Sequence, residues 1–271
     1  MPPQRRRLDA ELVRRKIARS REQAVAMIKE GRVFVGGFPA GKPATVVDPD
    51  ASIRVEGSTD DDWASRGAHK LLGALAAFPV DLKGKKILDA GASTGGFTDV
   101  CLRNDAAEVL AVDVGYGQLL WRLQNDERVT VLDRTNIRYL TPELTDGPCD
   151  GMVGDLSFIS LRLVLPAIIK CMAPGAFLLP MVKPQFEVGK DRLGTGGVVR
   201  SPELRAQVTA EVAEFAQGLG LSCLGMAASP LPGPSGNVEY FLHLINDGGE
   251  RAASADALQE MARVAVEEGP H

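Results

Sequence analysis

The feature that most restricts how this chain can fold is a regular alternation of short apolar runs with helical segments from residue 63 onward. Because strand–helix–strand units place helices on both faces of a parallel sheet, this alternation predicts a doubly wound α/β domain. A final strand is expected over 237–245, and the polar, alanine-rich tail behind it is expected to be helical. The apolar runs that predict the other strands are 86–88, 109–112, 129–132, 151–153 and 176–180.

The first of these strands runs directly into a glycine-rich turn, KILDAGASTGGF over 86–97. Glycines let the backbone pass close to a ligand, and the following helix start offers free N–H groups. The next strand ends in Asp113, 22 residues after Gly91, where a carboxylate can accept hydrogen bonds from ribose hydroxyls. The GxxxGG order and the strand-end Asp89 differ from the dinucleotide fingerprint, whose glycines fit a pyrophosphate. They favour a cofactor with a ribose but no phosphate, such as S-adenosylmethionine, although an ordinary tight turn is the alternative.

Four polar residues lie where the predicted elements meet one rim of the sheet. Asp155 and Lys183 each follow an apolar run, and Lys183 also precedes a proline that stops its strand. Lys70 belongs to the segment RGAHK, and Glu239 belongs to the segment NVEY. Since ligands bind at the carboxyl ends of parallel strands, these four side chains are candidates for catalysis. The alternative is that Lys70 is an exposed helix residue and Glu239 a charge on an edge strand.

The N-terminal segment is strongly basic although the chain as a whole is acidic. Residues 1–32 hold ten Lys or Arg and four Asp or Glu, a net charge of +6, whereas the whole chain carries −4, so the remainder sums to −10. This asymmetry is expected when one module docks on phosphate groups. A solvated helical face without such a role is the alternative interpretation.

Two basic helices followed by a small sheet are predicted for this segment. The first helix is expected over 8–18, and the second begins at Ser20, with Gln23 completing a capping box, and stops at Gly31. Short strands are expected over 33–35 and 52–55. The sequence therefore predicts three parts, namely a small α+β domain over 1–58, a polar linker over 59–66 and the α/β domain over 67–271.

Cysteine usage and hydropathy exclude several classes of protein. The four cysteines lie tens of residues apart without a CxxC motif, and only three histidines are present, so neither a zinc site nor a disulfide framework is expected. The N-terminus has no apolar core of signal-peptide type. The most apolar stretch, 163–182, is interrupted by Lys170 and three prolines and is too short for a membrane helix. We therefore expect a cytoplasmic protein that has no membrane partner and no metal.

Long blocks of the sequence resemble one known family over nearly the whole chain. They are SRGAHKL (65–71), LDAGASTGGFTDV (88–100), DVGYGQL (113–119), DLSFISL (155–161), KPQFEVGK (183–190) and SPLPGPSGNVEYFL (229–242). These blocks resemble the TlyA family of rRNA cytidine 2′-O-methyltransferases, also labelled hemolysin A, whose catalytic part has the FtsJ/RrmJ-type fold. The front part is similar to the S4 RNA-binding domain in RLD (7–9), SR (20–21) and GRV (31–33). The resemblance implies a Rossmann-like class I methyltransferase sheet behind a small α+β S4-like domain.

The resemblance also implies roles for individual residues. Lys70, Asp155, Lys183 and Glu239 take the positions of a K-D-K-E tetrad. S-adenosylmethionine is the implied cofactor, and cytidines in 16S and 23S rRNA, free or in ribosomal subunits, are the implied substrates. The expected cofactor contacts are Asp89, Gly91, Ala92, Ser93, Thr94, Gly95, Gly96, Phe97, Asp113, Val114, Asp133 and Asp155, with Asp133 near the adenine. The expected RNA contacts are Arg5, Arg6, Arg7, Arg14, Arg15, Lys16, Arg19, Arg21, Arg66 and Phe158.

A ribose 2′-hydroxyl is a poor acid, so its attack on a sulfonium methyl group requires removal of its proton. A buried lysine beside another cation favours the neutral amine, which makes Lys183 a candidate general base. Lys70 would then orient the hydroxyl, and Asp155 and Glu239 would fix both amines. The reverse assignment, with Lys70 as the base, remains open. Phe158 would stack on the target base or would belong to the hydrophobic core.

Three other functions fit parts of this pattern. A methyltransferase acting on an exocyclic amine would carry its substrate at the Asp155–Phe158 loop, although DLSF lacks the two prolines of the motif typical of those enzymes. A non-catalytic RNA-binding or ribosome-assembly protein would not bind the cofactor. A membrane-lytic protein would need an apolar or amphipathic membrane segment, and the sequence shows none. The oligomeric state is left open.

Overall fold

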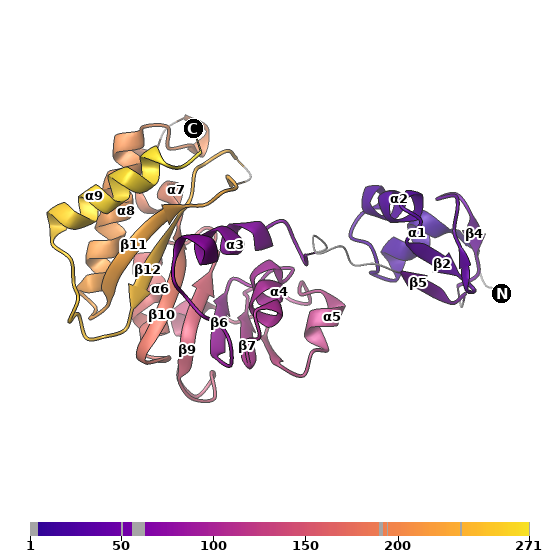
Figure 1. The fold of residues 1–271 in the computed structure, drawn as a ribbon, viewed down its shortest axis with the longest axis horizontal. Coiled ribbons are helices and arrows are strands. Elements are labelled where there is room, and N and C mark those ends of the chain that lie inside the picture. Colours follow the sequence, from indigo (N-terminus) through magenta and orange to yellow (C-terminus); the bar gives the residue numbers. More distant parts are fainter. Residues whose placement is uncertain are drawn as a thin grey trace. The chain divides into compact units, whose positions relative to one another are not determined.

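The computed structural model describes residues 5–49, 51–55, 63–189, 192–193, 195–233 and 235–270. The chain forms two compact units, Met1–Asp62 and Trp63–His271 (Figure 1). The boundary differs from the expected linker over 59–66, because residues 63–66 pack with the second unit. Ala64 is fully buried there, and its N–H donates a hydrogen bond of 2.8 Å to the Asp99 carboxylate. Residues 59–62 lie outside the described residues.

The N-terminal unit is a small α+β domain with its own core. The strand β2 lies between β3 and β5 in an antiparallel sheet, and β1 pairs with β4. Leu8 and Leu12 pack against Ala24 and Val33 in a core that joins the helices to the strands. The elements are β1 (Arg6–Arg7), α1 (Leu8–Arg14), α2 (Arg21–Lys29), β2 (Val33–Val35), β3 (Phe38–Pro39), β4 (Val46–Val47) and β5 (Ile53–Val55).

Local signals determine where α2 begins and ends. The Ser20 hydroxyl accepts a hydrogen bond of 3.2 Å from the Gln23 N–H, as the cap prediction requires. The Gln23 side-chain oxygen in turn accepts a hydrogen bond of 2.7 Å from the N–H of Arg19, one residue before the expected partner. Gly31 adopts φ +73° just after the helix, which confirms the predicted left-handed stop.

The second unit is built on a seven-stranded sheet with the order β11-β12-β10-β9-β6-β7-β8. The five strands from β10 to β8 are parallel, whereas β12 runs antiparallel to both of its neighbours. The elements are α3 (Ala68–Ala77), β6 (Lys86–Ala90), α4 (Gly96–Arg103), β7 (Glu108–Val112), α5 (Trp121–Gln124), β8 (Val129–Leu132), η1 (Ile137–Tyr139), β9 (Cys149–Gly154), α6 (Leu161–Ile169), β10 (Met172–Val182), α7 (Pro184–Glu187), η3 (Thr195–Gly197), α8 (Pro202–Gln217), β11 (Ser222–Ala228), β12 (Tyr240–Ile245) and α9 (Ala255–Glu267).

The predicted doubly wound Rossmann-like fold and the helical tail are confirmed, with one addition. The strand β11, with the sequence SCLGMAA, was not predicted, because it contains no β-branched residue and carries a glycine in its middle. Together with β12 it extends the parallel sheet by an antiparallel pair. Among the described residues, every helix is too short or too polar to cross a lipid bilayer.

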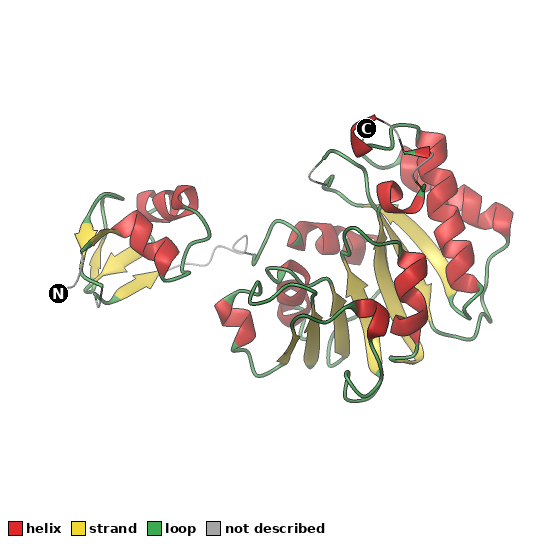
Figure 2. Cartoon of the chain, turned by 180° about the vertical axis from the view of Figure 1, so that it is seen from behind, coloured by secondary structure: helices red, strands yellow, loops and turns green. Residues whose placement is uncertain are grey.

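Helices cover both faces of this sheet. Along β6 the side chains alternate, so that Ile87 packs under α3 and α4, whereas Leu88 joins the core beneath α6, α8 and α9. Figure 1 shows α3 and α4 over the nearer face, and Figure 2, the view from behind, shows α6 over the other face. The chain passes from β8 on one side of β6 to β9 on the other, so the carboxyl ends of β6 and β9 flank the point where ligands bind in this architecture.

Candidate active site

The glycine-rich loop between β6 and α4 comes very close to the loop that follows β9. Gly91 has φ +89°, and a Cβ atom there would lie 2.9 Å from the backbone oxygen of Asp155. Gly95, the N-cap of α4, has φ +98°, and its Cβ atom would collide with Leu123. Only glycine meets both demands, a left-handed backbone and no side chain. The loop therefore brings the start of α4 and the end of β9 together.

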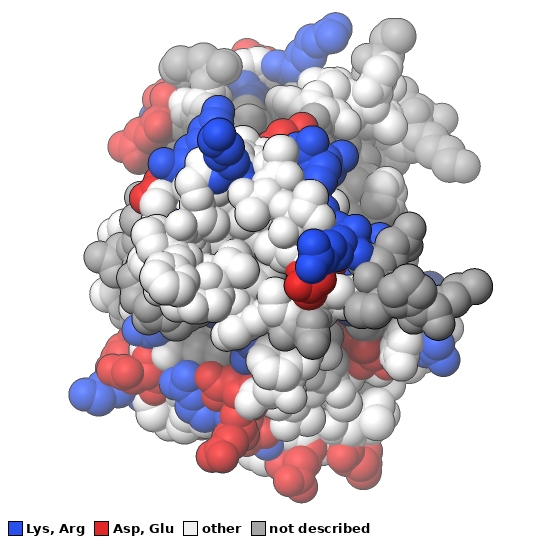
Figure 3. Space-filling view, turned by 90° about the vertical axis from the view of Figure 1, so that its right-hand side faces the viewer, with Lys and Arg blue, Asp and Glu red and all other residues white. Residues whose placement is uncertain are grey.

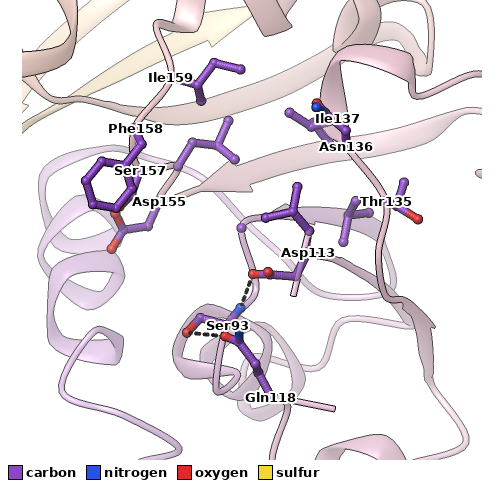
Figure 4. Close-up of a pocket in the computed structure, with 14 residues that line it drawn as sticks. Ser93, Asp113, Gln118, Thr135, Asn136, Ile137, Asp155, Ser157, Phe158 and Ile159 are labelled. Atoms are coloured by element: carbon purple, nitrogen blue, oxygen red, sulfur yellow. Dashed lines mark hydrogen bonds between the residues drawn. The ribbon is translucent and has the colours of Figure 1, made fainter. Parts of the chain in front are cut away.

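A cavity of about 510 Å³ opens beside this loop (Figure 4). Asp113, which follows β7, projects into it and is held by two backbone donors, the N–H of Ser93 at 2.8 Å and the N–H of Gly115 at 2.7 Å. Each carboxylate oxygen keeps a second lone pair for a ligand. The cavity is lined by Gly91, Ser93, Val112, Asp113, Val114, Gln118, Thr135, Asn136, Ile137, Asp155, Leu156, Ser157, Phe158 and Ile159.

Seven of the twelve predicted cofactor contacts do not line this cavity, and two of them, Asp89 and Asp133, support the structure around it. Asp89 is fully buried beneath the loop, where it accepts a hydrogen bond of 2.6 Å from the Thr98 hydroxyl, and burial raises its pKa to about 7. Asp133 accepts a hydrogen bond of 2.8 Å from the N–H of Gly117 and so braces the loop after β7. At the third strand end the cavity wall is instead formed by residues 135–137, which sequence reasoning missed because they follow the strand-end acid by two to four positions.

A second, smaller cavity of about 290 Å³ adjoins the first. Its lining includes four predicted cofactor contacts of the glycine-rich loop, Ala92, Thr94, Gly96 and Phe97, and also the predicted RNA contact Arg66. Gly91, Ser93, Asp155 and Ser157 line both cavities, so the two are continuous at the end of β9. The predicted contact Gly95 lines neither of them. The lysines Lys70 and Lys183 both lie in the wall of this smaller cavity.

The four predicted tetrad residues come from four separate elements and converge at this point. Lys70 lies in the first turn of α3, Asp155 follows β9, Lys183 follows β10, and Glu239 precedes β12. The Lys70 ammonium lies 2.6 Å from a Glu239 oxygen and 3.3 Å from an Asp155 oxygen. The Lys183 ammonium lies 2.5 Å from the other Asp155 oxygen and 3.8 Å from Glu239. Two amines and two carboxylates thus form one ion-pair cluster.

The burial of this cluster rules out the alternative interpretations of two members. Lys70 and Lys183 are each only 6% exposed, and Glu239 is 1% exposed. Lys70 is therefore not a surface helix residue. Glu239 is not an edge-strand charge either, because β12 lies inside the sheet between β10 and β11. Charges buried to this degree are held by mutual pairing, since each alone would be strongly destabilising.

Ser157 joins the cluster, although the sequence analysis did not single it out. Its hydroxyl accepts a hydrogen bond of 2.8 Å from the Lys183 ammonium, and it lines both cavities. A single serine in a loop carries no distinctive pattern. Its position two residues after Asp155 was the only available signal.

Phe158 lies in the same loop and points into open space. Its side chain is 90% exposed, which excludes the interpretation as a core residue. Its backbone has φ +63°, a conformation that a bulky residue rarely adopts. The ring packs only at an angle against Phe186, with the ring centres 5.3 Å apart. An exposed aromatic side chain on a strained backbone beside a cavity is typical of a binding surface.

On the face that Figure 3 shows, the basic side chains of the N-terminal unit lie in several groups with uncharged surface between them. Many are held by buried acids. The Arg7 guanidinium lowers the pKa of Asp9 to about 2, and Arg14 lowers that of Glu11 to about 2. Arg15 turns inward and donates hydrogen bonds of 2.7 and 2.8 Å to the carbonyls of Ala51 and Pro49. Among the predicted RNA contacts that form ion pairs in this unit, Arg15 has the least exposed side chain. Within this unit, the predicted RNA contacts with exposed side chains are Arg5, Arg6, Arg7, Arg14, Lys16, Arg19 and Arg21.

Comparisons with known proteins match both units. Residues 63–246 match the FtsJ-like methyltransferase family, and residues 6–53 match the S4 domain. The 16S/23S rRNA (cytidine-2'-O)-methyltransferase TlyA of Mycobacterium tuberculosis is 56% identical over 266 residues, which cover 98% of this chain and 99% of that protein. The 23S rRNA (cytidine-2'-O)-methyltransferase TlyA of Campylobacter jejuni is 30% identical and covers 84% of this chain and 95% of its own length.

A solved structure agrees with these relatives. The chain described as "Putative hemolysin from Streptococcus thermophilus" has a TM-score of 0.72 and 36% identity, and the match covers 99% of this chain and 98% of that one. This chain carries the cluster of buried lysines and carboxylates, the glycine-rich loop and the two units. Its relatives over most of its length include proteins named as rRNA (cytidine-2'-O)-methyltransferases. This chain belongs to the TlyA family of rRNA (cytidine-2'-O)-methyltransferases, with an S4 domain and an FtsJ-like methyltransferase domain.

Proposed function

We propose that this methyltransferase modifies the ribose 2′-hydroxyl of cytidines in 16S and 23S rRNA, with S-adenosylmethionine as the methyl donor. The observation that carries the proposal is the convergence of Lys70, Asp155, Lys183 and Glu239 on a cavity that adjoins the glycine loop. Relatives named for this reaction on 16S/23S and on 23S rRNA support the choice of substrate.

The larger cavity has the size and the chemistry for the methyl donor. Its volume of about 510 Å³ lies within the range of small-molecule sites. Asp113 would accept hydrogen bonds from the ribose hydroxyls, and Val114 and Ile137 would contact the adenine. Figure 4 shows Asp155 and Phe158 on one side of the cavity and Asn136 and Ile137 on the other. The donor would place its sulfonium group near Asp155, where the two cavities meet.

The tetrad would remove the proton as the new bond forms. Bound S-adenosylmethionine would supply the methyl group to the 2′-oxygen and leave as a neutral thioether, and the hydroxyl proton would pass to the neutral Lys183 amine. Proton transfer by a positioned group contributes about 10²–10⁴-fold in rate. Holding hydroxyl, methyl group and sulfur in line supplies much of the rest.

Charge balance supports this assignment. The fully ionised tetrad contains two positive and two negative charges and is neutral, so Lys183 must lose its extra proton before it can act as the base. Loss of one proton from the tetrad leaves a single negative charge, which the adjacent sulfonium charge would offset. Lys70, with its hydrogen bond of 2.6 Å to Glu239, would orient the hydroxyl. Asp155 contacts both amines and sets the distance between them.

RNA recognition would be divided between the two units. We assign phosphate contacts to the basic side chains of the N-terminal domain over 1–58, because contacts of this kind orient a protein without reading sequence. Arg66 in the smaller cavity and the exposed ring of Phe158 would hold the target nucleotide. Phe158 would stack on a base that is turned out of its helix.

Substitution of Lys183 tests the chemistry. Lys183→Met keeps the aliphatic chain but removes the amine, and we expect turnover to fall by at least about 10²-fold while affinity for S-adenosylmethionine stays within about twofold. Transfer of radiolabelled methyl groups to ribosomal subunits and titration calorimetry measure the two quantities. Lys170→Met, at the exposed end of α6, is the matched control. Normal turnover of the Lys183 variant would remove the tetrad from the mechanism.

The site of methylation separates sugar chemistry from base chemistry. Ribosomal RNA from cells with and without the protein is digested and mapped by mass spectrometry. We expect the added methyl group on the ribose of cytidine. A methyl group on an exocyclic amine would favour the amine-directed alternative, and an unchanged methylation pattern would favour a ribosome-assembly role.

A further inference from the structure

Two segments that carry catalytic candidates are fastened to each other at three points. Residues 155–161 follow β9, and residues 183–187 follow β10. At the first point, the Lys183 ammonium contacts Asp155 and Ser157. At the second, the Phe186 and Phe158 rings pack together. The third point is Glu187, the last residue of α7, which lies outside both cavities.

Both oxygens of the Glu187 carboxylate accept internal hydrogen bonds. One oxygen accepts the N–H of Leu161 at 2.6 Å, and the other accepts the Ser160 hydroxyl at 2.7 Å. Both partners lie at the start of α6, a nine-residue helix whose first N–H groups have no partner within the helix. Burial raises the pKa of Glu187, and the Arg162 guanidinium lies 3.9 Å away. A carboxylate at this end of a helix is favoured by the helix dipole.

The segment that Glu187 holds is under backbone strain. Phe158, between the first and third fastening points, has φ +63° and an exposed ring. Strain of this kind persists only where the surroundings enforce it. With Lys183 alone, the segment 155–161 would be held at one end. Glu187 holds the other end, so the conformation that aims Asp155 at the lysines is fixed from both sides.

We infer that Glu187 is a positioning residue for methyl transfer, because its carboxylate ties the start of α6 to α7 and thereby fixes the Asp155–Phe158 loop relative to Lys183. The inference rests on the proposed function. Glu187 lines neither the larger nor the smaller cavity, so its effect on the reaction passes through the Asp155–Phe158 loop.

Four variants test this role. Glu187→Ala removes both hydrogen bonds, whereas Glu187→Gln keeps an oxygen for Leu161 and an amide for Ser160. Ser160→Ala removes the bond of 2.7 Å to Glu187 together with the N-cap bond of 3.1 Å from the Arg162 N–H, and it leaves the bond from Leu161 to Glu187 in place. It replaces Glu187→Ala in the test if that variant does not fold. The matched control is Glu211→Gln, which removes the other carboxylate partner of Arg162, at 3.1 Å, on the half-buried side of α8.

The measured quantities are kcat and KM for ribosomal subunits, the Kd for S-adenosylmethionine, and amide hydrogen exchange over residues 155–161. For Glu187→Ala we expect kcat to fall up to about 100-fold, because small displacements of reacting groups have effects of that size. Exchange in the loop should accelerate, and the Kd should stay near that of the wild type. Glu187→Gln should restore most of kcat, and Ser160→Ala should lie between them.

The inference is overturned if Glu187→Ala, or Ser160→Ala where the former is unfolded, matches Glu211→Gln in both kcat and loop exchange. It is also overturned if Glu187→Gln loses as much activity as the alanine variant, since the hydrogen bonds would then not be the cause. Lys183→Met is measured in the same assay. An inactive Lys183 variant beside a fully active Glu187 variant refutes only this inference, whereas an active Lys183 variant refutes the proposed function.

Discussion

The buried charges of the site limit which substitutions the protein tolerates without unfolding. Lys70 and Lys183 are almost completely buried, and both form ion pairs with the buried carboxylate of Glu239. Removing one partner of a buried pair leaves an uncompensated charge and destabilises a protein by about 3–5 kcal/mol. The two carboxylates and two amines are therefore a unit, and a single substitution changes both stability and chemistry. The midpoint of thermal unfolding should therefore be measured on the same preparation as the activity, so that a loss of stability is not mistaken for a loss of chemistry.

Asp89 provides a test of burial that is independent of catalysis. Its folded-state pKa of about 7 lies above the ordinary value of 3.8, so between about pH 4 and pH 7 the folded protein holds a proton that the unfolded chain releases. The free energy of unfolding should therefore fall as pH rises through this window, by up to about 4 kcal/mol from this group. Asp89→Asn, which keeps an oxygen for the Thr98 hydroxyl, should remove that fall.

Urea unfolding of the second unit measures this difference. Both tryptophans, Trp63 and Trp121, belong to that unit, so their fluorescence follows its unfolding without a contribution from the N-terminal domain. We expect the wild type to lose stability relative to the asparagine variant between about pH 4 and pH 7 and to run parallel to it above pH 7. Parallel curves over the whole range would show that Asp89 is already ionised in the folded protein.

At the scale of elements, the sequence predicted strands and strand ends better than loops. A strand leaves a local pattern of apolar residues, and the residue after it is fixed by that pattern, which is why Asp113, Asp155 and Lys183 could be named in advance. The strand β11 lacked such a pattern, and its partner β12 supplies the pairing. Ser157 and residues 135–137 reach the cavities through loop conformations that no periodicity encodes. The contacts of Glu187 could not be predicted, because its partners Ser160 and Leu161 lie 27 and 26 residues away in the sequence.

The close approach of the glycine loop to the β9 loop can be tested by adding one methyl group. Gly91→Ala would place a Cβ atom 2.9 Å from the Asp155 oxygen on a backbone with φ +89°. We expect the affinity for S-adenosylmethionine to fall by about tenfold or more, because the two loops that form the cavity must separate; strain of about 1–3 kcal/mol is typical of such a position. Calorimetric titration measures the affinity.

Gly84→Ala is the control for the backbone effect. Gly84 has φ +70°, but a Cβ atom there would meet nothing within 4 Å. This variant should lose stability through strain alone and bind the cofactor as the wild type does. Equal losses of affinity in both variants would attribute the effect of Gly91→Ala to general destabilisation rather than to the contact with Asp155.

At the scale of the whole molecule, charge and chemistry are assigned to different units. The first 32 positions carry a net charge of +6 on a chain whose total is −4, whereas the buried tetrad and both cavities lie in the second unit. Phosphate contacts release counterions, so binding that depends on the N-terminal domain should weaken steeply with salt. Cofactor binding in the second unit should depend much less on salt. The two properties are therefore separable by truncation.

The place of truncation matters because residues 63–66 support the cofactor loop. The Ala64 N–H binds Asp99 of α4 at 2.8 Å, the Arg103 guanidinium lies 4.2 Å from the Trp63 ring centre, and residues 65–67 line the smaller cavity. A chain that begins at Trp63 should fold and bind S-adenosylmethionine like the full protein, but bind ribosomal RNA weakly and with a reduced salt dependence.

A chain that begins at Gly67 lacks residues 63–66 and their contacts, so the Asp99 carboxylate loses the hydrogen bond from the Ala64 N–H. We expect its cofactor affinity to be lower by about tenfold or more, since an unmade buried bond is worth about 1–3 kcal/mol. Calorimetry and filter binding at several salt concentrations compare the three chains, and equal cofactor affinity in both truncations would show that these residues belong to a linker after all.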